Sequence, residues 1–379
     1  MIPRILMAGL ALSLAGCGTV SGWFNSGPPQ PKPAELVAFK QAVSLAEAWK
    51  AETAEIATAR VWPVLMGEDI IAAGGSRVVR VAVPNGTVRW RSDIDFRVMA
   101  GAGAGDGLAL LGGNKGEVVA LDAATGQSRW QTRLSSEVVG APLVSGEQVV
   151  VRTGDGRIQG LAAADGNRLW LYSRILPALS LRGAVGMTLA DGTLYAGFPG
   201  GKLVALNPAN GAQLWEATVA LPRGATELER VADVMGAPVV DARQVCAVTY
   251  RGRLACFDRV TGALLWARET SSHAGLAMDT HNIYITDDQD AIVAHDKASG
   301  RAVWRQDKLA RRQVTAPLAL GAWVVVADGE GYVHVLSAED GSFVGRAKLD
   351  SPVRTAPVDI GPGFAVQTIK GTVIAFRLQ

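Results

Sequence analysis

Short apolar runs separated by tight-turn signals recur along the chain, and residues 138–171 show the arrangement clearly. This stretch contains four apolar or alternating runs, at 138–144, 148–153, 157–162 and 167–171. Turn signals that contain glycine lie at 154–156 and 165–166, where a positive φ is needed at little cost. β-Branched residues and a period of two are typical of strands, and no helical period separates these runs. The pattern therefore predicts four short antiparallel strands.

The same unit repeats along the chain with a spacing of about 40 residues. Its motif is G-x-Φ-x-x-Φ-D/N-x-x-T/N/D-G-x-x-Φ-W, in which Φ is apolar, and copies begin at positions 75, 116, 156, 201, 252, 290, 331 and 371. A repeated four-stranded antiparallel unit of this length is typical of a propeller blade. The sequence thus predicts an all-β, eight-bladed β-propeller. We expect the recurring tryptophans to pack between neighbouring blades rather than to bind a ligand.

The last copy of the repeat provides only three strands, at 355–358, 363–368 and 372–377. Residues 43–51 resemble the tryptophan-bearing fourth strand of the other copies, and Trp49 lies in register with Trp90 and its successors. An open sheet edge invites aggregation. We therefore expect the N-terminal strand to complete the last blade and to close the ring.

The N-terminus has the features of a secretion signal. Arg4 precedes an apolar run at 5–14, and Leu14-Ala15-Gly16-Cys17 matches the cleavage box of bacterial lipoproteins. The sequence predicts a signal peptide at 1–16, a lipid on Cys17, a flexible tether at 17–34 and the propeller at 35–379. The alternative is an ordinary signal peptide in which the cysteine occurs by chance. Gly18 resembles the outer-membrane sorting pattern of Gram-negative lipoproteins.

Composition and motifs give no indication of catalysis or of a cofactor. The net charge is +2, without a basic stripe for nucleic acid, and no later stretch is long enough to span a membrane. The glycine-rich stretch 101–107 is expected between two strands of one blade, with no helix to bind a phosphate. Asp287-Asp288-Gln289-Asp290 is expected in a hairpin turn and lacks the glycine and distal glutamate of a calcium loop. No His-pair metal motif or G-x-S-x-G elbow is present.

Two cysteines remain beyond the N-terminus, Cys246 and Cys256, and they flank the turn at 250–252. If the turn is centred on Arg251 they face each other, and an oxidising periplasm would permit a disulfide. If it is centred between Arg251 and Gly252 the pair is out of register and stays reduced.

Two connections between blades are longer than the rest. Successive repeats are 38 to 41 residues apart, except that 45 residues separate Gly156 from Gly201 and 51 separate Gly201 from Gly252. The extra residues follow Trp170 and Trp215 and should emerge on one face, where repeat proteins usually bind partners. Apolar residues beside Arg182, opposite an acidic second loop, indicate a protein-docking site. The alternative is structural: the leucines at 179 and 181 cover the propeller floor and Arg182 pairs internally with an acid at 229 or 233.

The whole chain resembles the BamB family, the propeller lipoproteins of the outer-membrane β-barrel assembly (BAM) machinery. Besides the lipobox, the tether and the repeats, the resemblance rests on the segments 179–183 (LSLRG), 226–234 (TELERVADV) and 329–334 (GEGYVH). It implies a non-catalytic scaffold at the periplasmic face of the outer membrane that binds the POTRA domains of BamA. Unfolded outer-membrane proteins are a further candidate partner. Within the motifs, the family's partner-binding positions correspond to Leu179, Leu181, Arg182 and Asp233. The family often has a second acid where this sequence has Met235.

Two other classes share such repeats. Quinoprotein dehydrogenases are much larger and carry vicinal cysteines and a calcium cluster, neither of which is visible here. A periplasmic glycan-binding propeller would need exposed aromatic residues on one face. Bound quinone would absorb visible light, whereas a subunit of the assembly machinery would co-purify with a large β-barrel protein.

Overall fold

The computed structural model describes residues 32–56, 61–181, 183 and 185–379. Cys17, the predicted signal peptide and nearly all of the predicted tether lie outside the described residues, as does Arg182. Residues Ala34–Gln379 form one compact unit. In the described part of the chain, no helix is long and apolar enough to cross a membrane.

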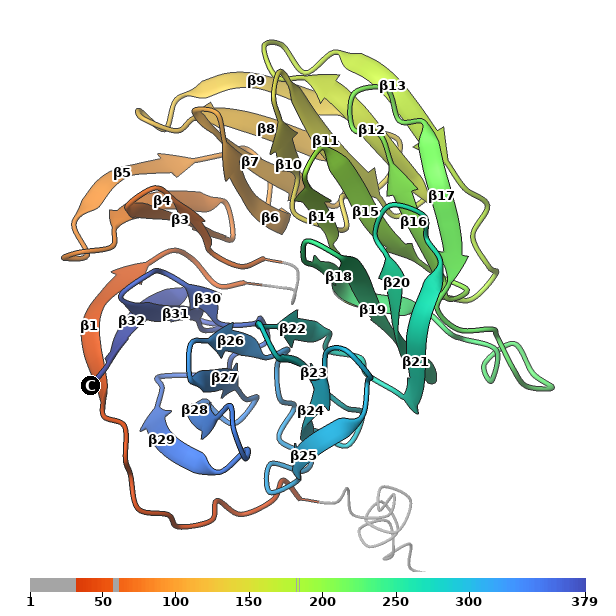
Figure 1. The fold of residues 1–379 in the computed structure, drawn as a ribbon. Coiled ribbons are helices and arrows are strands. Elements are labelled where there is room, and N and C mark those ends of the chain that lie inside the picture. Colours follow the sequence, from red (N-terminus) through yellow and green to blue (C-terminus); the bar gives the residue numbers. More distant parts are fainter. Residues whose placement is uncertain (1–31, 57–60, 182, 184) are drawn as a thin grey trace, which may run out of the picture. The chain divides into compact units, whose positions relative to one another are not determined.

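This unit consists of eight four-stranded antiparallel sheets that follow one another around a ring (Figure 1). The first strand of each sheet contacts the first strand of the next sheet, so these strands line the inside of the ring. Blade 1 contains β2 (Val64–Met66), β3 (Asp69–Gly74), β4 (Arg77–Ala82) and β5 (Val88–Asp93). Blade 2 contains β6 (Val98–Gly105), β7 (Leu108–Gly113), β8 (Glu117–Asp122) and β9 (Ser128–Arg133). Blade 3 contains β10 (Leu143–Ser145), β11 (Gln148–Thr153), β12 (Arg157–Ala162) and β13 (Arg168–Ser173). Blade 4 contains β14 (Met187–Ala190), β15 (Thr193–Phe198), β16 (Lys202–Leu206) and β17 (Gln213–Thr218).

The remaining blades continue the pattern. Blade 5 contains β18 (Val234–Val240), β19 (Gln244–Thr249), β20 (Gly252–Asp258) and β21 (Leu264–Thr270). Blade 6 contains β22 (Leu276–Met278), β23 (Asn282–Thr286), β24 (Ile292–Asp296) and β25 (Ala302–Gln306). Blade 7 contains β26 (Leu318–Leu320), β27 (Trp323–Ala327), β28 (Tyr332–Ser337) and β29 (Phe343–Lys348). Blade 8 has the order β30 (Val358–Asp359), β31 (Gly363–Gln367), β32 (Thr372–Leu378) and β1 (Leu45–Glu52). The predicted eight-bladed propeller is confirmed.

The N-terminal strand closes the ring as predicted. β1 pairs antiparallel with β32 from Leu45 opposite Leu378 to Glu52 opposite Thr372, with Trp49 opposite Ala375. The inner strand β30 also contacts β2, so blade 8 packs against blade 1. The β32 edge is thereby covered by a strand that comes from the other end of the chain.

The recurring tryptophans pack between blades, as the repeat predicts. Trp130 of blade 2, for example, is 8% exposed and belongs to a core cluster that includes Val149 and Leu161 of blade 3. Its indole Nε1 donates a hydrogen bond of 2.8 Å to the carbonyl of Ala163 in that blade. Nε1–H groups donate to a carbonyl of the following blade in the same way at Trp49, Trp90, Trp170, Trp215, Trp266 and Trp304.

At blade 7 the motif has Gly345 instead of tryptophan, and the N-terminal segment occupies this place. The backbone N–H groups of Ala42 and Val43 both donate to the carbonyl of Val344, at 2.9 Å. The chain thus crosses blade 7 immediately before it enters blade 8 as β1. A tryptophan at position 345 would compete with this crossing segment for the same space.

One prediction about the interior is wrong. The glycine-rich stretch does not connect two strands, because Gly101 to Gly105 form part of the inner strand β6 and only the residues at 106 and 107 make the turn. Close packing explains the glycines: a Cβ at Gly103 would lie 1.9 Å from the carbonyl oxygen of Pro142, next to β10 of blade 3.

Candidate partner-binding site

The two long connections lie side by side on the ring. The first loop (residues 174–186) connects β13 to β14, and the second loop (residues 219–233) connects β17 to β18. The end of the first loop runs beside β18: Val185 forms a parallel bridge with Gly236, and Gly186 N–H donates to Gly236 O at 3.1 Å. The end of the first loop therefore lies against the inner strand of blade 5, which directly follows the second loop.

Asp233 joins the two loops from below. Its side chain is only 4% exposed, and its carboxylate accepts hydrogen bonds from the backbone N–H groups of Leu181, at 2.6 Å, and Gly200, at 3.1 Å. Burial raises the pKa of Asp233 above its usual range, although these two hydrogen bonds act in the opposite direction. Asp233 therefore positions the first loop. Its sequence context suggested a charge exposed to a partner, but the carboxylate is buried.

The leucines of the first loop point outward. Leu179 is 43% exposed and Leu181 is 37% exposed, so neither is buried against the propeller floor. Arg182 follows Leu181 in the chain but lies outside the described residues. Asp233 and Glu229 are the two acids that could pair with Arg182 inside the protein. Both carboxylates accept hydrogen bonds from backbone N–H groups.

The second loop is stabilised by hydrogen bonds within itself. Glu229 Oε2 accepts from the N–H groups of Ala225, at 2.7 Å, and Thr226, at 3.0 Å, while Thr226 Oγ1 accepts from Glu229 N–H. This reciprocal pattern is that of a capping box. The hydrogen bond from Thr226 N–H, followed by that from Ala225, lowers the pKa of Glu229. The loop is thus a defined structure that can present side chains at fixed positions.

Three further apolar residues of the two loops are exposed, and the sequence did not single them out as binding residues. Ile175 in the first loop is 96% exposed, and Leu221 and Leu228 in the second loop are 62% and 63% exposed. Apolar side chains that are exposed in a contiguous patch, rather than singly, mark an interaction site. The exposure of these three residues could not be read from the sequence.

Met235, where the family resemblance led us to expect an acid, is an interior residue. It is 2% exposed, and a Cβ at Gly183 would lie 2.2 Å from its terminal methyl group. Met235 therefore supports the first loop by apolar packing from beneath.

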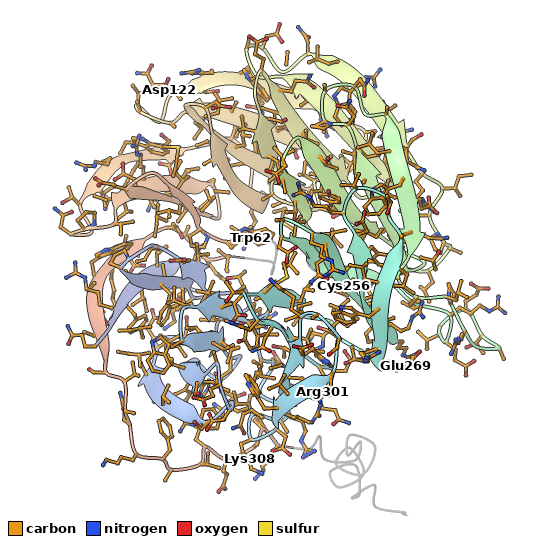
Figure 2. The ribbon with its side chains drawn as sticks, viewed as in Figure 1. Trp62, Asp122, Cys256, Glu269, Arg301 and Lys308 are labelled. Atoms are coloured by element: carbon orange, nitrogen blue, oxygen red, sulfur yellow. A yellow bond between two sulfur atoms is a disulfide. The ribbon has the colours of Figure 1, made fainter. Side chains whose placement is uncertain are left out.

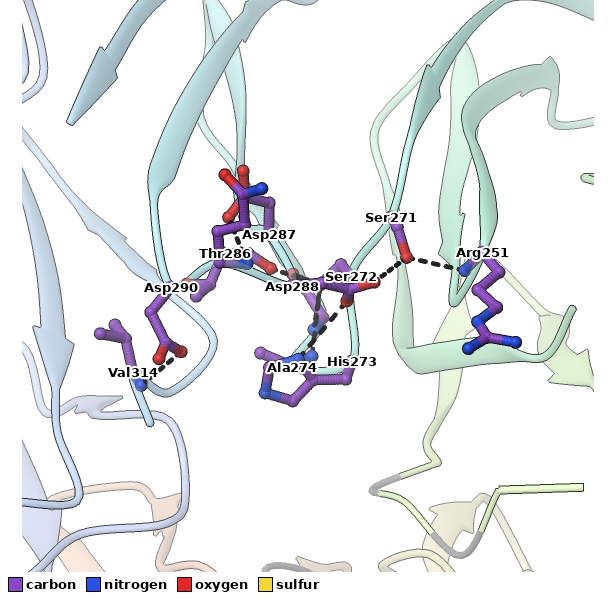
Figure 3. Close-up of polar contacts among 12 residues, drawn as sticks. Arg251, Ser271, Ser272, His273, Ala274, Thr286, Asp287, Asp288, Asp290 and Val314 are labelled. Atoms are coloured by element: carbon purple, nitrogen blue, oxygen red, sulfur yellow. Dashed lines mark hydrogen bonds and ion pairs between the residues drawn. The ribbon is translucent and has the colours of Figure 1, made fainter. Parts of the chain in front are cut away.

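The carboxylates of Asp287, Asp288 and Asp290 form hydrogen bonds with other groups of the protein (Figure 3). Asp287 Oδ1 accepts from two backbone N–H groups in its own turn, and Asp290 accepts from those of Gln313 and Val314 at 2.9 Å. Asp288 contacts Ser271 and lies 3.5 Å from a ring nitrogen of His273. The described residues contain no group of three or more His, Cys, Asp or Glu residues placed to hold a metal ion.

Cys246 and Cys256 face each other and form a disulfide in blade 5, with Cα atoms 4.1 Å apart (Figure 2). The register of β19 and β20 places Val248 opposite Leu254, so the turn is centred on Arg251, the first of the two arrangements considered. Arg251 has a φ of 50°, and its N–H donates to Ser271 Oγ at 2.7 Å. Both cysteines are fully buried.

Comparisons with known proteins agree on one family. The family model described as "Outer membrane protein assembly factor BamB" matches residues 74–306 and 288–378. The factor of that name from Nitrosomonas eutropha is 41% identical, over 99% of this chain and 93% of its own length. The one from Bordetella pertussis is 40% identical, over 98% of this chain and 96% of its own length.

Solved structures support the same assignment. The crystal structure of BamB from Moraxella catarrhalis superposes with a TM-score of 0.81 at 27% identity, covering 88% of this chain and all of that one. A quinohemoprotein alcohol dehydrogenase from Comamonas testosteroni reaches a TM-score of 0.68 at 16% identity, which shows a shared fold alone. The chain belongs to the BamB family of outer membrane protein assembly factors, which are non-catalytic accessory proteins.

Proposed function

We propose that this propeller is a scaffold of the outer-membrane assembly machinery that docks the periplasmic POTRA domains of BamA with its two long loops. By holding BamA, it would assist the assembly and insertion of β-barrel proteins. The observation that carries the proposal is a set of large apolar side chains exposed on two loops that a hydrogen bond from Leu181 N–H to Asp233 connects: Ile175, Leu179, Leu181, Leu221 and Leu228.

These loops meet the physical requirements of a protein-docking surface. Binding energy concentrates in a few apolar or arginine anchors that become desolvated, surrounded by a polar rim. The leucines are such anchors, and the polar residues of the second loop provide a rim. Because Leu181 N–H donates a hydrogen bond to Asp233, Leu181 is held in place in the free protein, which lowers the entropy cost of binding.

The place of action follows from the N-terminal motif. The lipobox ending at Cys17 would attach a diacylglycerol, and Gly18 favours sorting to the outer membrane. The relatives are named as outer membrane protein assembly factors, in keeping with this location. We therefore propose a protein anchored to the outer membrane by lipid, with the propeller in the periplasm.

The test is capture of purified BamA POTRA domains by the propeller. Leu181→Ala combined with Arg182→Glu should weaken capture by about thirtyfold or more, since truncating a central anchor costs about 2 kcal/mol or more. Gln127→Glu, an exposed change in the turn between β8 and β9, is the control and should capture normally. Circular dichroism must show that each variant is folded. Native affinity in the folded double variant would mean that the loops have only a structural role.

A further inference from the structure

A buried arginine without a counter-ion lies next to the first loop. Arg152, on β11 of blade 3, is 3% exposed, and its Nη1 has no hydrogen-bond partner. Its guanidinium stacks over the ring of Phe198 in blade 4, 4.5 Å from the ring centre. No carboxylate among the described residues forms an ion pair with it, and burial alone lowers the pKa of Arg152 to about 10.

Arg152 lines a pocket of about 200 Å³ between blade 3 and the first loop. Ser180 and the proposed docking residue Leu181 are part of its lining. Leu176, Val185 and Pro199 provide apolar walls, and three glycines allow close approach to the backbone. Glu137 also lines the pocket and makes an interaction of its own. The pocket thus combines the buried positive charge of Arg152 with a wall of mixed polar and apolar residues beside the docking surface.

Such a charge is costly for the isolated protein. Transferring an ion from water to a protein interior costs several kcal/mol unless a partner of opposite charge is provided. Among the described residues, the other buried arginine, Arg312, has such a partner in Asp328 at 2.7 Å, and the partly buried Arg80 pairs with Asp69 at 2.6 Å. Arg152 departs from this pattern, and its guanidinium offers a planar pair of donors that suits a carboxylate.

We propose that this pocket binds a carboxylate side chain of the docked partner, which pairs with the Arg152 guanidinium when the two loops engage. The inference rests on the proposed function and adds a chemical requirement to it: the partner surface carries an aspartate or glutamate where it meets this pocket. Charge complementarity identifies the occupant, since a bound acid would remove the unpaired charge that the free propeller tolerates.

The test compares stability and binding in Arg152→Met, which keeps the volume and removes the charge. The melting temperature of the free propeller should rise by about 2 °C or more, because a buried unpaired charge is replaced by an apolar side chain. The affinity for purified BamA POTRA domains should fall by about tenfold or more. Arg80→Met is the matched control: it leaves Asp69 with only the longer ion pair to Arg89, at 3.5 Å, so the melting temperature should fall while the affinity of folded protein stays unchanged.

The partner side provides a second measurement that leaves the propeller intact. Each aspartate and glutamate of the POTRA fragment is replaced by its amide, and one replacement should weaken binding to the wild-type propeller but not to Arg152→Met. If none couples to Arg152, the carboxylate pocket is wrong. A lower melting temperature for Arg152→Met, or native affinity, would also overturn it. So would stabilisation of the wild type by sodium acetate over sodium chloride with no change in partner affinity, which would indicate a site for free anions.

The two proposals fail in different ways. Loss of capture in the loop double variant, with native affinity in Arg152→Met, would reject the pocket and keep the docking function. A wild-type propeller that captures no POTRA domain would reject the docking function and the pocket with it.

Discussion

At the scale of single residues, the fold depends on contacts between a tryptophan and a turn glycine of the next blade. A Cβ at Gly166 of blade 3 would lie 2.6 Å from the Trp130 ring of blade 2, and Gly166 has a φ of 75°. The repeat motif predicted both residues because each recurs at a fixed spacing. Their role as one unit across the blade interface was not apparent until the structure paired them.

This pairing predicts unequal effects of two similar substitutions. Gly146 also has a positive φ, of 58°, but a Cβ at this position would meet no atom within 4 Å. Gly146→Ala should lower the free energy of unfolding by about 1 kcal/mol through backbone strain. Gly166→Ala should cost about 2 kcal/mol or more, because overpacking against Trp130 adds to the same strain. Urea denaturation of both variants measures the difference, and equal losses would disprove the contact.

At the residue scale, part of the candidate site could be predicted from the sequence, and the rest could not, for physical reasons. Leu179 and Leu181 were predicted from the loop length and the family resemblance, and both are exposed. Asp233 was predicted too, but its burial depends on N–H groups at 181 and 200, far away in the sequence. Arg152 gave no signal, since an arginine in a strand is ordinarily exposed and only the packing of blades 3 and 4 buries it.

At the scale of elements, blade 7 holds the N-terminal strap (residues 34–43) through a buried ionic cluster. Arg312 pairs with Asp328 and donates to the carbonyl of Ala34 at 3.0 Å. Arg346 donates through Nη1 to the carbonyl of Val37 at 2.9 Å and through Nε to His334 Nδ1 at 3.0 Å. The strap is therefore fixed on blade 7 before it becomes β1.

The hydrogen bonds determine the charge state of the histidine in this cluster. Because His334 Nδ1 accepts from Arg346, the ring proton lies on Nε2 and is donated to Asp328 at 2.9 Å. Burial lowers the pKa of His334, although the hydrogen bond to Asp328 acts in the opposite direction. The neutral ring is thus the form that the folded state stabilises.

A pH dependence follows from this lowered pKa. The unfolded chain takes up the proton near pH 6.5, whereas the folded state resists it, so the stabilisation is complete above about pH 6.5 and is lost as the pH falls below it. The wild type should lose more stability than His334→Gln between pH 7.5 and 5, because glutamine stays neutral. Urea midpoints across this range measure the loss. Parallel curves for the two proteins would contradict the assignment.

The sequence predicted the strands better than it predicted the contacts between segments that are distant in the chain. Strands and turns followed from local periodicity, and β1 was predicted because its tryptophan is in register with the repeat. The strap was not, since its partners lie about 300 positions away in the sequence and no local pattern reveals such contacts. The glycine stretch in β6 was placed wrongly because glycine, usually a turn signal, here allows two inner strands to approach closely.

At the scale of the whole molecule, closure of the ring leaves the two long loops as the main departure from the repeat. The family match covers the repeats and both loops. Repetition made the overall architecture predictable, because each blade repeats one local pattern and needs only its neighbours. What lies on the loop surface depends on single residues, and repetition does not predict them.

The proposed attachment to the membrane also belongs to the scale of the whole molecule. Cys17→Ser should remove the site of lipid attachment and leave an unprocessed or soluble form, because a thiol is required for the thioether to the diacylglycerol. Membrane fractionation and lipid labelling of the variant provide the measurement. Normal labelling and fractionation would show that Cys17 is an ordinary residue near a signal peptide.

The most direct test of the central claim is crosslinking within cells. A photocrosslinking amino acid at Leu179, which lies on the first loop, should form an adduct with BamA. The same amino acid at Gln127 in blade 2 should form none, since that turn lies outside the loop surface. An adduct at Leu179 alone is the predicted result. Absence of an adduct at Leu179, or a BamA adduct only at Gln127, would contradict the docking surface proposed for this propeller.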